Sequence, residues 1–355
     1  MRRHHKVHAS LAVLLAGIAL CGPALATADV NFQPDPLEPG RHPMIPHDHS
    51  EATTAELRAN IPVFATMPDN LLHMIMNSMR ADYAWYISPA QTRGRVGLLV
   101  LNHGVSEPSD QTFRSRLEPL AQRQPTAIAF GMAMTTGQAL QQAADDLNAA
   151  GVETIVAVDY GTSDYRSLRR QWQYILGLRD QPAYAKVARV TSRAPLLMTG
   201  SVNDSPLVAQ ILLDHARELS RDEAGEAVVI IAHGPEDNTD NERDLVELGK
   251  LATWVKTASR FASVEALNIQ DDAPPPVRAA NARAFRAKVS DARARGQDVI
   301  VVPYVINVAG VQPKLQKDLA GLEFRFQEKG ISEHPNFLRW IDQAVAETLG
   351  RADRR

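Results

Sequence analysis

Two histidine-glycine pairs are the residues of this chain best suited to chemistry. His103-Gly104 and His233-Gly234 each follow an apolar run typical of a buried strand. A neutral imidazole can bind a divalent metal ion or accept a proton, and glycine lets the backbone turn sharply beside a ligand. Each histidine could instead cap its strand by hydrogen bonding and bind nothing. The recurrence of the pair strengthens the functional interpretation, and both interpretations stay open.

Two methionines could add soft ligands to the first pair. Met132 and Met134 are two residues apart at the end of a predicted strand, so their side chains would share a face. Together with His103 they could bind cuprous copper, which prefers thioether and imidazole ligands. Alternatively, both methionines fill gaps in the core. The sequence alone leaves both interpretations open.

The histidines must be positioned by the elements that alternate after Gly94. Short apolar segments alternate with amphipathic ones, which predicts an α/β fold with parallel sheets flanked by helices. In such sheets ligands bind at the carboxyl ends of the strands, where both His-Gly pairs lie. Strands are expected at 96–101, 126–132, 153–159, 194–198, 227–232, 263–269, 298–305 and 323–327, and helices at 109–121, 137–149, 167–178, 205–219, 241–259, 277–295 and 335–349.

The predicted order of elements occurs twice along the chain. The two His-Gly pairs are 130 positions apart, and Pro206 and Pro335, which open the last helix of each half, are 129 positions apart. Matched spacings of this kind predict an internal duplication. We expect one unit over 94–222 and a second over 223–355.

The motifs around these pairs resemble those of the class II chelatases, which include the sirohydrochlorin cobaltochelatases and ferrochelatases. The resemblance extends from about residue 96 to residue 347 and is carried by Leu98–Gly104, Val228–Gly234, Val299–Tyr304 with Gly310 after it, and Gly330–Pro335. It implies two tandem chelatase-like units and a lyase reaction, the insertion of a metal ion into sirohydrochlorin. It also implies that His103 and His233 are catalytic, because the family's first-strand histidine binds the metal and helps to remove protons from the macrocycle.

The sequence departs from the chelatase pattern in two places. The family has a second metal-binding histidine in a turn after the third strand, where this chain has Gln312, a weaker ligand for cobalt, nickel or iron. The family's acidic residue after the second strand is missing, although Asp271 or Asp272 could replace it. The implied metal ligands, His103, His233 and Gln312, therefore form an incomplete set. Two functions stay open: a chelatase, and a non-catalytic periplasmic carrier of a metal ion or tetrapyrrole.

Residues 1–28 have the pattern of a secretory signal peptide. Three basic residues precede the apolar run 11–20, and small residues follow at positions 24, 26 and 28. Cleavage would release an exported, periplasmic protein without its only cysteine, Cys21, which excludes cysteine-based metal sites and nucleophiles. Leu20 is bulky where a lipoprotein signal requires a small residue, which argues against lipid attachment at Cys21. No membrane insertion is expected after processing, because no later segment has the about 20 apolar residues that a spanning helix needs.

The segment 29–93 is expected to form an N-terminal arm followed by one helix. Residues 29–67 are rich in proline and polar residues and include His42, His47 and His49, which could collect metal ions or simply belong to an exposed linker. Proline in the first turn and apolar residues on one face predict a helix over 68–80.

Composition excludes several classes of function. The chain is 45% hydrophobic and 22% charged, which is typical of a globular protein with a substantial core. It has 38 basic and 41 acidic residues, and a net charge of −3 argues against nucleic acid as a partner. Gly-x-Ser-x-Gly and phosphate-binding Gly-Lys-Ser motifs are absent, so no organic cofactor is expected. The expected partners are a divalent metal ion and a tetrapyrrole.

Overall fold

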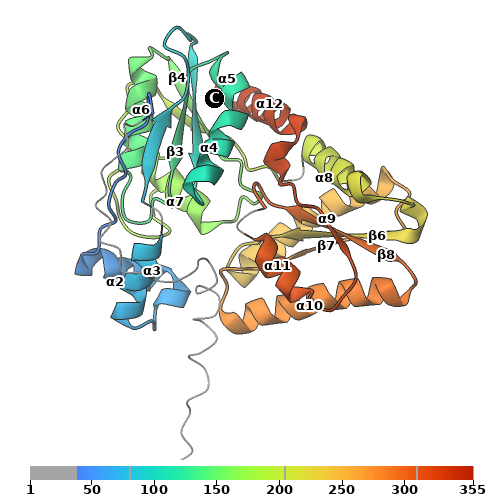
Figure 1. Ribbon diagram of the computed structural model, residues 1–355. Coiled ribbons are helices and arrows are strands. Elements are labelled where there is room, and N and C mark those ends of the chain that lie inside the picture. The colour runs from blue at the N-terminus through green and yellow to red at the C-terminus, as the bar shows by residue number, and fades with distance from the viewer. Residues whose placement is uncertain (1–37, 80, 204, 309–310, 355) are drawn as a thin grey trace, which may run out of the picture. The chain divides into compact units, whose positions relative to one another are not determined.

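The computed structural model describes residues 38–79, 81–203, 205–308 and 311–354 (Figure 1). Residues 38–355 form one compact unit. The predicted signal peptide, residues 1–28 with Cys21, lies outside the described residues. Gly310 lies outside them as well.

The first sheet contains five strands in the order β1-β3-β2-β4-β5. The strands β2, β3, β4 and β5 are parallel, as predicted, whereas β1 pairs antiparallel with β3 at the edge of the sheet. The bounds are β1 Tyr83–Tyr86, β2 Val96–Asn102, β3 Thr126–Phe130, β4 Thr154–Val158 and β5 Leu196–Met198. The edge strand β1 was not predicted, because it is only four residues long and is apolar throughout, without alternation.

The second sheet contains four parallel strands in the order β7-β6-β8-β9. Their bounds are β6 Glu226–Ala232, β7 Ser263–Asn268, β8 Asp298–Tyr304 and β9 Arg325–Phe326. Both sheets are flanked by helices, which confirms the α/β class. When the parallel strands of each sheet are numbered by their order in the chain, both sheets have the same spatial order: second, first, third, fourth. This agreement is what a duplication would produce, but the duplication itself stays a prediction.

The predicted helices form with ends displaced by a few residues, except that the one expected over 109–121 is divided at Leu117 into α4 and α5. A short additional helix, α11, begins at Gln312, where a turn was expected. None of the helices in the described residues is long and apolar enough to cross a membrane. The bounds are α2 Glu51–Asn60, α3 Asp69–Ser78, α4 Glu107–Arg116, α5 Glu118–Ala121, α6 Gln138–Ala149, α7 Ser167–Ile175, α8 Pro206–Leu219, α9 Asn238–Thr257, α10 Pro275–Ala294, α11 Gln312–Asp318 and α12 Pro335–Ala352.

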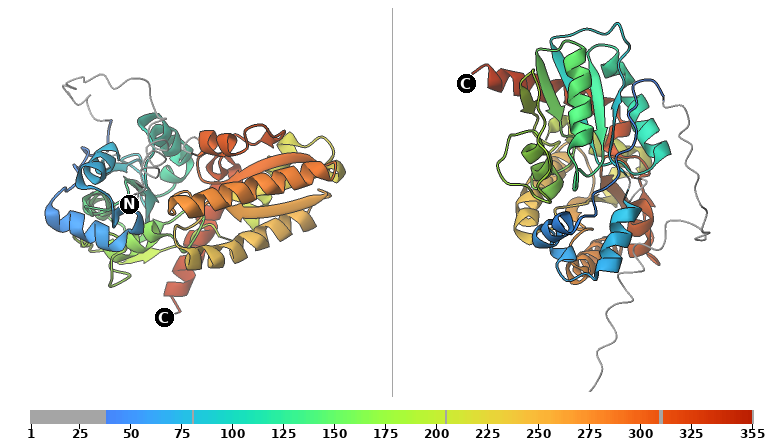
Figure 2. Two further views of the ribbon diagram at one scale, coloured as in Figure 1. Left: turned by 90° about the horizontal axis from the view of Figure 1, so that it is seen from below. Right: turned by 90° about the vertical axis from the view of Figure 1, so that its left-hand side faces the viewer.

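The strand β6 is apolar without alternation because both of its faces are buried. Val228 and Ile230 pack into the core that contains α8, α9 and α12, whereas Val229 and Ile231 pack against α10 on the other face. Figure 2 shows α10 lying along the second sheet. A continuous apolar run is typical of a parallel strand covered on both sides.

The two halves exchange their last helices. The helix α8 follows the first sheet in sequence but packs on β8 of the second sheet, and α12 follows the second sheet but packs on β4 of the first (Figure 1). One buried apolar cluster accordingly contains Val100 of β2, Ile230 of β6 and Trp340 of α12. The carboxyl ends of β2 and β6 therefore belong to halves that share a core.

The expectation of an extended arm over 29–67 was wrong for part of its length. The helix α2 begins after Ser50, whose side chain caps it by accepting a hydrogen bond from the Thr53 backbone, and Leu57 is fully buried. A short 3-10 helix, Pro62–Phe64, follows. The helix α2 was not predicted, because the segment is rich in proline and polar residues. Its stability comes from packing a few apolar side chains. The predicted helix over 68–80 is confirmed as α3.

Candidate functional site

The first His-Gly pair forms a tight turn at the carboxyl end of β2. Gly104 has a φ of 71°, a conformation that glycine adopts without strain, and its amide donates to the Asn102 side chain at 2.8 Å. The Val105 amide donates to Asp110 of α4 at 3.1 Å. The His103 Nδ1 lies 2.5 Å from the Gly104 carbonyl oxygen. Side chains on both sides of the turn thus hold the His103 backbone in place.

The second pair repeats this geometry at the carboxyl end of β6. Gly234 has a φ of 73°, and the His233 Nδ1 lies 3.1 Å from the Gly234 carbonyl oxygen. A carbonyl oxygen can only accept a hydrogen bond, so in both neutral imidazoles Nδ1 carries the proton. The lone pair is then on Nε2 of His103 and of His233. Both side chains can act as a metal ligand or a proton acceptor through Nε2.

An acidic side chain accompanies His233. The Asp272 carboxylate lies 3.6 Å from the His233 Nε2 and is largely exposed. Asp271 instead pairs with Arg278 at 2.9 Å and Lys314 at 2.5 Å, which lowers its pKa against the opposing effect of burial. Of the two acids considered from the sequence, the structure places Asp272 beside the histidine and uses Asp271 in an ion-pair network.

Groups from both halves act electrostatically on the His103 imidazole. The His103 side chain reaches solvent, but the protein around it displaces bulk water, and this desolvation lowers the pKa of His103. The Gly104 carbonyl opposes the shift. The charges of His233 and Asp272 act on the same imidazole, with His233 lowering its pKa and Asp272 raising it. Groups from both halves therefore lie within electrostatic range of His103.

The third predicted ligand, Gln312, does not join this pair in the structure. It opens α11, and its side-chain amide donates to Glu328 at 3.1 Å. A small pocket of about 10 Å³ beside His233 is lined by Val311 and Lys314 from the same segment, but not by Gln312. Within the described residues, no three His, Cys, Asp or Glu side chains are grouped as metal ligands. The role of Gln312 stays a prediction.

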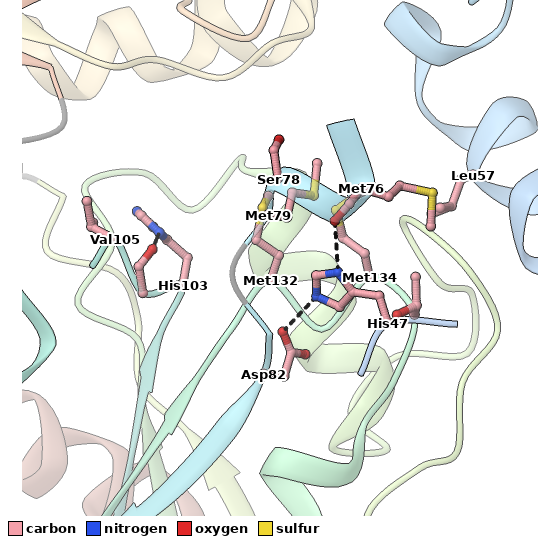
Figure 3. Close-up of a pocket in the computed structure, with 12 residues that line it drawn as sticks. His47, Leu57, Met76, Ser78, Met79, Asp82, His103, Val105, Met132 and Met134 are labelled. Carbon is pink, nitrogen blue, oxygen red and sulfur yellow. Dashed lines mark hydrogen bonds and ion pairs between the residues drawn. The ribbon is translucent and has the colours of Figure 1, made fainter. Parts of the chain in front are cut away.

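A cavity of about 270 Å³ lies beside His103 (Figure 3). It is bounded by the segment before β1, by the end of β2 and by the loop after β3. Its lining combines thioether, apolar and polar side chains: His47, Leu57, Met76, Ser78, Met79, Asp82, His103, Val105, Met132, Met134 and Thr135, with Gly104. Sequence reasoning identified His103, Met132 and Met134 here but missed Met76, Met79 and Asp82. The repeat of methionine at positions 74, 76 and 79 was the signal that could have found the α3 methionines.

The reason given for Met132 and Met134 sharing a face was wrong. The strand β3 ends at Phe130, so both methionines lie in the loop that follows it. Gly131 has a φ of 128° and Ala133 a φ of 51°, so the strand alternation does not continue. Both methionines nevertheless line the same cavity, because this irregular loop turns them toward it.

A buried carboxylate holds that loop in place. Asp82 is 2% exposed, and its carboxylate accepts a hydrogen bond from the Ala133 amide at 3.0 Å. His47 lies between α3 and Asp82: its Nδ1 donates to the Met76 carbonyl at 3.1 Å, and its Nε2 lies 3.8 Å from Asp82. Burial raises the pKa of Asp82, and the contact with His47 opposes that shift. His47 is therefore engaged with its neighbours in the fold, as is His42, whose Nε2 lies 2.8 Å from Asp146.

The acidic residues after His233 have structural partners. Asp237 caps α9 by accepting from the Asp240 amide, Asp240 pairs with Arg170, and Asp244 accepts from Asn268 at 2.8 Å. These contacts explain the acidic start of α9 without a metal ion.

Comparison with known proteins identifies the fold. Neither a described protein family nor a curated protein matches the sequence. SirB from Bacillus subtilis, solved with Fe³⁺, is similar with a TM-score of 0.53 and 14% identity, over 74% of this chain and 98% of SirB. DR2241 from Deinococcus radiodurans, described as a multi-domain protein structurally similar to chelatases, has a TM-score of 0.43 and 18% identity, over 71% of this chain and 55% of DR2241. The protein has a chelatase-like fold.

Proposed function

We propose that the protein binds a divalent metal ion, cobalt, nickel or iron, through His103 and His233 and inserts it into a tetrapyrrole such as sirohydrochlorin. One observation carries the proposal. The two histidines occupy corresponding strand ends, and each has its Nδ1 held by the next carbonyl and its Nε2 available as a ligand. The effect of His233 on the pKa of His103 supports a joint site.

The chemistry of insertion matches what these side chains can do. A divalent ion enters the macrocycle as the inner pyrrole nitrogens lose their protons, so the site needs a metal ligand and a proton acceptor. A lowered pKa keeps His103 neutral at neutral pH, which suits both roles. Asp272 beside His233 adds a negative charge that favours a cation. Gln312 would add a weak oxygen ligand if its amide turned from Glu328 toward the metal.

A non-catalytic periplasmic carrier of the metal ion or tetrapyrrole is the second candidate. The observation that favours it is the small ligand set: no group of three His, Cys, Asp or Glu side chains is placed to hold a metal ion in the part of the chain that the structure describes. Export, proposed from residues 1–28, also favours a carrier, because tetrapyrrole synthesis is normally cytoplasmic. Sequencing the amino terminus of protein from the native host tests export, since retained Met1 would contradict it.

Calorimetric titration with Co²⁺ and Ni²⁺ tests the metal site. We expect His103→Ala and His233→Ala each to weaken binding by at least about tenfold, because loss of a group that only supports a ligand already costs about 10–100-fold. His42→Ala is the matched control, because His42 pairs with Asp146 on α6 and should leave affinity unchanged. Gln312→His should strengthen binding if this position faces the metal. Equal affinity in the wild type and both site variants would contradict the proposed site.

An absorbance assay of metal insertion into sirohydrochlorin separates the two candidates. Insertion by the wild type that is lost in His103→Ala would support the chelatase. Metal binding that depends on both histidines, without insertion, would support the carrier.

A further inference from the structure

The cavity beside His103 contains an unusual concentration of methionine. Four of the nine methionines in the chain line it: Met76 and Met79 come from α3 and the residue after it, and Met132 and Met134 come from the loop after β3. Figure 3 shows these side chains entering the cavity from both segments. Methionines that only filled gaps in the core would be spread over both halves, yet the second sheet and its helices contain none.

The loop that presents two of these methionines is held in a costly conformation. Ala133 has a φ of 51°, in the left-handed region that a residue other than glycine rarely adopts. A Cβ atom at Gly131 would lie 2.0 Å from the Asp82 carboxylate, so only glycine fits there. Backbone strain that the surroundings maintain is commonly found at ligand sites. Here the strain directs Met132 and Met134 toward the α3 methionines.

The size and polarity of the cavity define its occupant. A volume of about 270 Å³ is below the roughly 300–1,000 Å³ of pockets for drug-sized ligands, so a tetrapyrrole would not fit inside. Thioether sulfur is a soft ligand that favours Cu⁺ over harder divalent ions. Asp82 is the one acid among the lining residues that the structure describes. A cation bound nearby would favour its ionised form, whose charge would balance a single positive charge.

We propose that this cavity is a binding site for a soft monovalent metal ion, Cu⁺, coordinated by the thioethers of Met76, Met79, Met132 and Met134. The site differs from the proposed two-histidine site in its ligands, which are sulfur atoms from the segment before β1 and from the loop after β3. His103 lies on its rim. The inference does not rest on the proposed chelatase function, and either can fail without the other.

Titration with Ag⁺, a soft cation that does not change oxidation state, tests the site, and anaerobic competition with a chromophoric Cu⁺ chelator confirms it for copper. The variant Met79→Leu with Met132→Leu removes one sulfur from each segment while nearly preserving side-chain volume. We expect one ion per chain in the wild type and a loss of at least about tenfold in affinity in this double variant. Met198→Leu, on β5 outside the cavity, is the matched control and should bind like the wild type. Ni²⁺ binding should be equal in all three proteins.

Carbon-13 spectra of the methionine methyl groups test the proposal in the unmodified protein. One equivalent of Ag⁺ should shift the signals of Met76, Met79, Met132 and Met134 and leave those of Met44 and Met198 unchanged. Equal Ag⁺ affinity in the wild type and the double variant would overturn the proposal. So would a spectrum in which the four cavity methionines do not move, whatever the result for Ni²⁺ at His103 and His233.

Discussion

The two His-Gly turns have the same backbone and different surroundings. Gly104 and Gly234 have φ angles of 71° and 73°, and each histidine contacts the carbonyl oxygen of the glycine after it. The turn after β2 opens onto a cavity of about 270 Å³, whereas the pocket beside His233 measures about 10 Å³. The repeated sequence motif therefore determines the turn, and the chemistry around it depends on what else packs there.

The segment before β2 accounts for much of this difference. Residues 38–93 precede the first half and supply Met76, Met79, Asp82 and His47 to the cavity. The segment between α8, the last helix of the first half, and β6 is too short to supply such a segment to the second half. There, Asp271 and Lys314 form an ion pair beside His233. An added segment at one edge of the first sheet thus gives two similar turns different surroundings.

Buried carboxylates should give the largest measurable contrast between the halves. Asp159 is fully buried, pairs with Arg166 and Arg169 at 2.5 Å each, and has a pKa of about 2. Asp159→Asn removes the buried carboxylate that Arg166 and Arg169 share, although Arg169 keeps Asp164 as a partner. It should reduce the free energy of unfolding by about 3–5 kcal/mol. Asp271→Asn in the second half should cost less, because Lys314 reaches solvent and Arg278 keeps its ion pair with Asp318. Urea denaturation at pH 7 measures both, and an equal loss would contradict the contrast.

The depressed pKa of Asp159 also predicts a pH dependence. Its carboxylate binds a proton less readily in the folded chain than in the unfolded chain, so the stabilisation is complete above the ordinary pKa of 3.8. It is lost as the pH falls from about 3.8 toward 2. Asp159→Asn should remove this part of the acid sensitivity.

The two glycines should differ in their tolerance of a methyl group. Alanine at either position adopts the left-handed conformation at a cost of roughly 1–2 kcal/mol. A Cβ at Gly234 would also lie 2.5 Å from the Asn268 Cβ, whereas at Gly104 the nearest atom is an Asp110 oxygen at 3.5 Å. We expect Gly234→Ala to destabilise the protein by about 3 kcal/mol and Gly104→Ala by about 1 kcal/mol. Thermal and urea unfolding measure the order, and the reverse order would show that the turns pack differently.

The smallest expected effect tests the contact between the halves. His233→Gln removes an imidazole that lowers the pKa of His103 and should therefore raise that pKa, whereas Asp272→Asn removes a carboxylate that raises it and should lower it. Imidazole signals in NMR spectra recorded across a pH titration report both shifts, and His42→Gln should leave the pKa of His103 unchanged. Two shifts of the same sign would contradict the proximity of the three groups.

The sign of the stability effect at His103 follows from its lowered pKa. The folded chain binds this proton less readily than the unfolded chain, so protonation favours unfolding. The contribution of His103 to stability is complete above the ordinary pKa of 6.5 and decreases as the pH falls through the folded-state value.

The elements that the sequence predicted well are those whose apolar pattern is long. The strand at 227–232 was recovered as β6 within one residue, because a strand covered on both faces needs an uninterrupted apolar run. The elements that it missed are short or have few apolar residues, as in the ten-residue helix α2. The strand β1 and the helix α11 span four and seven residues, too few for a period to be recognised, and their stability comes from contacts with distant segments.

The candidate site likewise combines residues that a local pattern identifies with contacts that depend on distant segments. His103 and His233 could be identified because a repeated dipeptide after a strand is a local pattern, whereas the contact of Asp272 with His233 depends on the path of a loop. The side-chain contact of Gln312 could not be derived from its place in a motif, because its amide donates to Glu328.

By itself the sequence determined the class of fold, the two turns and the residues able to bind a metal ion, since these depend on local periodicity and on side-chain chemistry. Only the tertiary structure decided that α8 and α12 exchange partners, that His233 influences His103, and that four methionines line one cavity. Those arrangements join residues far apart in the chain. They follow from how whole faces of sheets and helices are buried, which no local pattern encodes.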